Sequence, residues 1–277
     1  MKKLVFTLAT CCIMCACEQK TETNPFFTEF RTEYGAPDFD KIKIEHYEPA
    51  FLKGIEEQNA EIKAIVESRE TPGFENTIVA LDNSGRTLAR VKGVFYALTE
   101  ADTNDEMSAL SEKIAPVLSE HNDNIYLNQD LYKRVAAVWQ QEQEGKITLT
   151  TEQHRLLDRY HKAFIRSGAG LDTGKQNRLR EINKELSTLA ITFSNHVLNE
   201  NNAYRLVIDN EAELAGLPEW VKTGAAEEAK ADGKEGKGLF TLQNSSRLPL
   251  LQYADNRELR KDIYEAYINR GNNGDAN

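Results

Sequence analysis

The chain has 277 residues, with 34 Lys and Arg against 44 Asp and Glu, and a formal net charge of −10. This acidic balance argues against a protein that binds nucleic-acid phosphates, because such proteins need a basic face. Hydrophobic residues at 40% and charged residues at 28% are typical of a folded globular chain, which excludes fibrous and wholly disordered classes.

The first seventeen residues resemble an export signal. Lys2 and Lys3 precede the apolar run 4–16, and the sequence becomes polar after Cys17. A run of 13 residues is too short to span a bilayer as a helix. The pattern is similar to a bacterial lipoprotein signal, so residues 1–16 are the expected signal peptide and Cys17 is the expected lipidation site.

Two alternatives stay open for this segment: an ordinary signal peptide with incidental cysteines, and lipidation at Cys11 or Cys12. Export is favoured in each case, and a lipid anchor implies a location in the cell envelope, facing the periplasm or the exterior. The remaining 260 residues contain no cysteine, which excludes a disulfide framework there. Removal of two lysines with the signal changes the formal charge to −12, so membrane binding would need the lipid anchor.

Residues 17–40 are expected to form a tether and an irregular segment, because Pro25, Gly35 and Pro37 interrupt helices. Residues 41–277 are expected to form a helical lobe. Apolar spacing and helix-end signals predict eight helices there, at 49–68, 76–98, 105–123, 128–145, 150–167, 173–199, 218–232 and 255–269.

Two of these predicted helices have the clearest amphipathic pattern. Within 76–98, apolar residues recur at intervals of three, four and seven: Ile78, Leu81, Leu88, Val91, Phe95 and Leu98. Within 173–199 they step by three or four: Leu179, Ile182, Leu186, Leu189, Phe193 and Val197. Such spacing is typical of the buried face of a continuous helix, so both sets are expected to be mostly core.

Helix-end and strand signals complete the predicted fold. Thr150 and Gln153 have capping-box spacing, and Gly168 is expected to end the helix that follows them. The short apolar segments 204–208 and 239–243 are expected to pair as antiparallel strands. The expected fold class is therefore mainly α, a multi-helix lobe with one small antiparallel β pair.

The histidines do not form a recognisable metal motif. None of the five belongs to a His-Glu-x-x-His helix, in which two imidazoles one turn apart reach one ion; they are His46, His121, His154, His161 and His196. His154 and His161 would lie about 10.5 Å apart along a helix axis, which is too far for both to bind one ion. A surface or packing role is favoured for that pair.

Other catalytic patterns are also missing from the sequence. No Gly-x-Ser-x-Gly elbow is present. Gly168, Gly170 and Gly174 before Lys175 have the wrong spacing for a phosphate loop, and no Ser or Thr follows the lysine, so a helix-to-helix turn is favoured. Residue patterns by themselves identify no catalytic and no metal-binding residue in this chain.

Ordered blocks along the chain carry a family resemblance. They begin with Phe-Glu-Asn-Thr-Ile-Val-Ala-Leu-Asp at 74–82, end with Tyr-Glu-Ala-Tyr-Ile-Asn-Arg-Gly at 264–271, and include 164–171, 193–199, 213–219 and 253–260. Together they resemble the N-terminal half of the thimet oligopeptidase family. The bacterial peptidyl-dipeptidase branch is the nearest likeness, with the oligopeptidase A branch as a near relative.

The resemblance implies a fold and an activity. Members are largely helical zinc metallopeptidases, with two lobes around a channel that admits short peptides. Their zinc is held by a His-Glu-x-x-His helix and a later glutamate in the C-terminal half. Zinc is thus the cofactor of the full-length family, but no catalytic or zinc-binding residue carries over to this sequence, and none is expected to bind zinc here.

Two functional interpretations follow. The first is the N-terminal portion of an exported, lipid-anchored peptidyl-dipeptidase or oligopeptidase, inactive alone, whose partners are short peptides and a missing C-terminal catalytic half. The second is a non-catalytic helical lipoprotein that binds peptides or a protein partner. The first interpretation further predicts apolar surface left exposed on this chain, beyond the few hundred Å² that is common on monomers.

Overall fold

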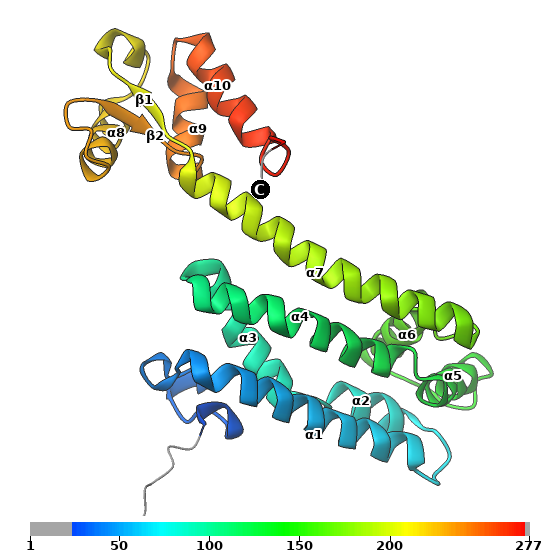
Figure 1. The fold of residues 1–277 in the computed structure, drawn as a ribbon. Coiled ribbons are helices and arrows are strands. Elements are labelled where there is room, and N and C mark those ends of the chain that lie inside the picture. The colour runs from blue at the N-terminus through cyan, green and yellow to red at the C-terminus, as the bar shows by residue number, and fades with distance from the viewer. Residues whose placement is uncertain (1–23, 275–277) are drawn as a thin grey trace, which may run out of the picture.

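The computed structural model describes residues 24–274, and helices make up most of them (Figure 1). The predicted signal peptide and Cys17 lie outside these residues. The helices are α1 (Tyr47–Glu67), α2 (Ala80–Asp82), α3 (Arg86–Ala101), α4 (Asp105–Tyr126), α5 (Gln129–Gln143), α6 (Thr151–Arg166), α7 (Thr173–Ala203), α8 (Glu219–Ala231), α9 (Asn244–Tyr253) and α10 (Arg257–Ile268). Between residues 24 and 274, no helix combines the length and apolar character needed to cross a membrane.

The predicted fold class is confirmed. Strands β1 (Leu206–Ile208) and β2 (Gly238–Phe240) pair antiparallel, with Val207 opposite Leu239. Both strands are shorter than predicted; β1 lies within the predicted segment 204–208, while β2 begins at Gly238, one residue before the predicted segment 239–243. The predicted capping box is also present, since the Thr150 side chain accepts from the Gln153 N–H and the Gln153 side chain accepts from the Thr150 N–H. Gly168 follows α6 with a φ of +91°, the left-handed conformation that ends helices.

The prediction of one continuous helix at 76–98 is wrong. A wide π-type turn at Phe74–Val79 leads into α2, and α3 begins only after a turn through Gly85. Gly85 has a φ of +72°, and its N–H donates to the Glu61 carboxylate on α1 at 2.7 Å. Asn-Ser-Gly at 83–85 was the sequence signal for this turn, since these residue types favour turns.

Helix α9 was not predicted. It spans Asn244–Tyr253 and contains Pro249, which removes one helical hydrogen-bond donor. The segment begins with Asn and two serines, which are typical of loops. Packing overrides these local preferences, because Leu250 is fully buried in the cluster that α9 forms with α8, α10 and the β pair.

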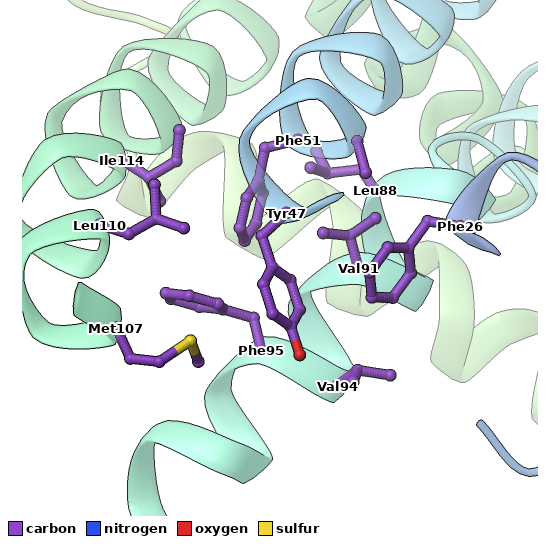
Figure 2. Packing of buried hydrophobic residues seen from close by; sticks show 11 residues of the cluster. Phe26, Tyr47, Phe51, Leu88, Val91, Val94, Phe95, Met107, Leu110 and Ile114 are labelled. Atoms are coloured by element: carbon purple, nitrogen blue, oxygen red, sulfur yellow. The ribbon is translucent and has the colours of Figure 1, made fainter. Parts of the chain in front are cut away.

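Three separate buried clusters stabilise the fold. The first lies among α1, α3 and α4 and is shown in Figure 2. In it, the Phe95 ring packs edge-to-face against Tyr47 and Phe51, with ring centroids 5.1 and 5.3 Å apart. The second cluster joins α1, α5 and α6, and the third joins the β pair to α8, α9 and α10.

The predicted irregular segment contributes to the first cluster. Pro25–Phe27 forms a single 3₁₀ turn, and Phe26 is fully buried with its ring centroid 5.2 Å from that of Tyr47. The Phe26 carbonyl accepts from the Arg90 guanidinium on α3 at 2.9 Å. The turn Pro25–Phe27, within the predicted irregular segment, therefore belongs to the packed body, and the predicted domain boundary stays a prediction.

Helix α7 links the helices α1 to α6 to the group formed by the β pair, α8, α9 and α10 (Figure 1). Helix α4 lies alongside its N-terminal part, and the β pair lies beyond its C-terminal end. Its predicted burial is wrong. Among the described residues, the three buried clusters contain no side chain from Thr173–Ala203. The only buried residues of α7 are Gln176 and Glu200, which are both polar. The 3.6-residue period predicted the helix correctly but not what covers it.

Candidate functional site

A small polar cavity of about 190 Å³ lies among α1, α2, α3, α4 and α6. Its lining includes Gln58, Asp82, Lys92, His121 and Tyr160. His121 is 5% exposed, and its Nε2 lies 2.7 Å from the Gln58 Oε1. Its Nδ1 is buried and has no hydrogen-bond partner among the described residues.

The protonation states of His121 and Tyr160 in this cavity follow from their surroundings. Burial, and secondly the Lys92 ammonium, lower the pKa of His121, so the imidazole is neutral at pH 7. The Tyr160 hydroxyl donates to the Asp82 carboxylate at 2.8 Å. Burial first, and then this carboxylate, raise the pKa of Tyr160, so its hydroxyl stays protonated. The contact joins α6 to α2 and has a structural role.

Two further histidines, His154 and His161, lie between α5 and α6. The His161 and Trp139 rings are stacked with centroids 4.6 Å apart and an interplanar angle of 8°. His154 stacks on the same indole at 6.1 Å, and its Nδ1 lies 2.7 Å from the Glu142 Oε1. Burial lowers the pKa of His161. The structure therefore places both imidazoles against an aromatic ring, in the packing role favoured by their spacing.

The two remaining histidines have separate positions. His46 is buried before α1, and its Nδ1 accepts from the Lys43 N–H at 3.0 Å. His196 is half-buried on α7. Within residues 24–274, no group of three or more His, Cys, Asp or Glu side chains is placed to hold a metal ion.

One face of α7 carries a row of exposed apolar side chains. Four apolar side chains on it, Ile182, Leu186, Leu189 and Phe193, are 36, 56, 54 and 55% exposed. They are spaced by four, three and four residues, so they lie in one row, which we call the α7 stripe. The stripe extends about 16 Å along the helix axis, at 1.5 Å per residue.

A different face of α7 packs against α4 through polar contacts. Asn183 donates to the buried Asp123 carboxylate at 2.7 Å, Arg180 donates to the Asn124 side chain at 2.9 Å, and Asn195 donates to Glu112 at 2.9 Å. Burial raises the pKa of Asp123, which the bond from Asn183 opposes. The polar contacts of α7, rather than its apolar row, therefore hold the helix on the body.

The stripe is bordered at both ends. Beside its N-terminal end lies a hollow of about 530 Å³, lined by residues of α4, α7 and the end of α6, among them Asp123, Arg166 and Leu186. At its C-terminal end the Phe193 ring lies against Gly271, so close that a Cβ there would be 2.6 Å from a ring carbon. The chain after α10 thus passes next to the stripe.

None of the known protein-family models matches the chain. The chain is 38% identical to dipeptidyl carboxypeptidase of Escherichia coli over 257 residues, which are 93% of this chain and 37% of that protein. It is 39% identical to the dipeptidyl carboxypeptidase of Salmonella typhimurium over 92% of this chain and 37% of the relative. Oligopeptidase A of Salmonella typhimurium is 33% identical, over 92% of this chain and 36% of the relative. The chain therefore spans a little over a third of the length of these relatives.

Proposed function

We propose, from the premise that this chain belongs to the thimet oligopeptidase family, that it is one helical portion of a peptidase that hydrolyses short peptides. The observation that carries the proposal is the identity to dipeptidyl carboxypeptidase, which is 38% and extends over 93% of this chain. A match over 93% of the chain includes most of its helices, so it is not explained by one shared motif. The mainly helical fold agrees with the fold implied by the family resemblance.

The portion described here would have a steric role. We propose that it forms one wall of a channel for short peptides, and that zinc and the catalytic groups belong to a second portion of the peptidase. Residues 24–274 offer no cluster of metal-ligating side chains. In such a peptidase zinc would supply Lewis-acid chemistry, and on this proposal the residues that hold it belong to the second portion. On this proposal the chain has no peptidase activity by itself.

An activity assay tests the proposal directly. The chain is purified alone, and also after co-expression with the part of Escherichia coli dipeptidyl carboxypeptidase outside the 257 matched residues. Each sample is incubated with Zn²⁺ and blocked peptides of various lengths, and the released fragments are measured by mass spectrometry. We expect release only from the co-expressed pair, and we expect a chelator to stop it.

Each other outcome of the assay has a definite meaning. Chelator-sensitive release by the chain alone would contradict its proposed inactivity. A purified pair that releases nothing would contradict the peptidase proposal. Peptide binding by the chain alone without any release would favour the non-catalytic lipoprotein. The Escherichia coli portion expressed alone is the control for activity that does not depend on this chain.

We also propose that the protein is exported and held at the membrane by a lipid on Cys17. The support is the sequence pattern, since Cys17 follows a charged start and an apolar run that ends in Ala16. Mass spectrometry of the mature N-terminus is expected to show a diacylated Cys17, and Cys17→Ala should release the protein from the membrane fraction. An unmodified N-terminus at another residue would contradict the lipid anchor.

A further inference from the structure

We infer that the α7 stripe is the docking surface for the second portion of the peptidase. The inference rests on the proposed function and extends it by naming the residues that bind that portion. The occupant is an apolar surface of the polypeptide that the longer relatives have in addition to the matched third. The stripe residues, Ile182, Leu186, Leu189 and Phe193, are the contacts on this chain.

The stripe belongs to none of the three buried clusters of the described chain, although its Phe193 ring lies against another segment, at Gly271. Its four side chains are 36 to 56% exposed, and the face of α7 that meets α4 is a different one, joined through Asn183, Arg180 and Asn195. An ordered row of large apolar side chains in water is unfavourable unless something covers it. Exposed apolar patches of this kind are typical of interaction sites.

The length of the relatives indicates what covers the stripe. The matched 257 residues are 37% of dipeptidyl carboxypeptidase, so the relatives have a further polypeptide nearly twice as long as the match. The hollow of about 530 Å³ beside Leu186 gives that polypeptide a recess next to the row, which can receive a protruding side chain.

A second copy of this chain is a poorer occupant. Each copy has a formal net charge of −10, so two copies repel each other in solution. One row of four side chains also offers little apolar area compared with the roughly 800 Å² per partner of a stable interface. A larger partner can cover the row and the adjoining hollow together, which is the reason to prefer the second portion of the peptidase.

The test measures binding between the full chain and the part of Escherichia coli dipeptidyl carboxypeptidase outside the matched 257 residues. The variants are Leu186→Gln, Leu189→Gln and the double variant, since Gln has nearly the helix propensity of Leu. Removing one buried leucine from an interface should weaken binding about tenfold, and the double variant about a hundredfold. Leu52→Gln on α1 is the matched control, because Leu52 is 49% exposed and lies outside the stripe.

The expected result is weaker binding for the stripe variants and unchanged binding for Leu52→Gln, with equal thermal unfolding of all variants. Equal binding by wild type and the double variant, or no binding by the wild type, would overturn the inference. A wild-type dimer that the stripe variants convert to monomer would overturn it in favour of a second copy. Stripe-dependent binding without peptide release would keep the docking surface and contradict the proposed function instead.

Discussion

Helices α3 and α7 have the same kind of apolar pattern and opposite surroundings. In α3, Val91 and Phe95 are fully buried, while in α7, Leu186 and Phe193 are 56 and 55% exposed. The difference arises from the neighbours. Helix α1 presents Tyr47, Phe51 and the small Gly54 to α3, so the apolar faces meet (Figure 2). Helix α4 instead meets α7 through carboxylates and amides. Apolar spacing therefore predicts that a helix forms, while the burial of its apolar face depends on the side chains of the neighbouring helix.

The sharpest test of this comparison is one substitution made in each helix. Phe95→Ala should lower the free energy of unfolding by about 3–5 kcal/mol, because it leaves a cavity among Tyr47, Phe51 and Tyr96. Phe193→Ala should lower it by less than about 1 kcal/mol, because the ring is 55% exposed. Urea unfolding measures both. Similar losses for the two variants would show that the stripe is buried in solution.

The close contact between α1 and α3 predicts the next largest effect. A Cβ on Gly54 would lie 2.8 Å from the backbone N and Cα of Leu88, so Gly54→Ala should cost about 2 kcal/mol through displacement of the two helices. Gly93→Ala is the matched control. It also lies inside a helix, but its Cβ meets nothing within 4 Å, so it should stabilise the chain by about 0.5–1 kcal/mol. Thermal melts of both variants check the prediction.

Loss of a polar contact between α7 and α4 should lower the free energy of unfolding by less than the two core substitutions, but by a measurable amount. Asn183→Ala removes the bond to Asp123 and leaves a buried carboxylate with less stabilisation, which should cost about 1 kcal/mol. Thr188→Ala on an exposed position of the same helix is the control and should be close to neutral. If the two variants unfold at the same denaturant concentration, the contact with α4 does not hold α7.

The pH dependence of stability should show the smallest effect. Burial lowers the pKa of His121 in the folded state, so as pH falls below the ordinary value of about 6.5 the unfolded state takes up the proton first. The folded state therefore loses stability as pH falls towards the lowered pKa, and above about pH 7 the contribution is constant. His121→Gln should give a shallower loss between pH 7 and 5, measured by urea unfolding. If the free energy of unfolding of the variant depends on pH as steeply as that of the wild type, the loss of stability arises from other groups, such as His161.

Local sequence information was sufficient for most of the helix ends. Thr150 with Gln153, and Gly168 after α6, are short-range signals whose hydrogen bonds and backbone angles involve only near neighbours. The β pair was also predictable, because its strands alternate over a few residues. The turn at Gly85 was missed although Asn-Ser-Gly at 83–85 is a local signal for it, because the apolar spacing continues across the turn. Helix α9 was missed because burial of Leu250, and not local preference, stabilises it.

The sequence by itself determined that this protein is helical, acidic and related to the dipeptidyl carboxypeptidases, because periodicity, charge and ordered motifs are properties of the chain alone. Only the tertiary structure decided which apolar face is covered. The row from Ile182 to Phe193 has the spacing of a core face, but α4 packs on another side of α7. Burial depends on residues far apart in the chain, and no pattern within one helix contains that information.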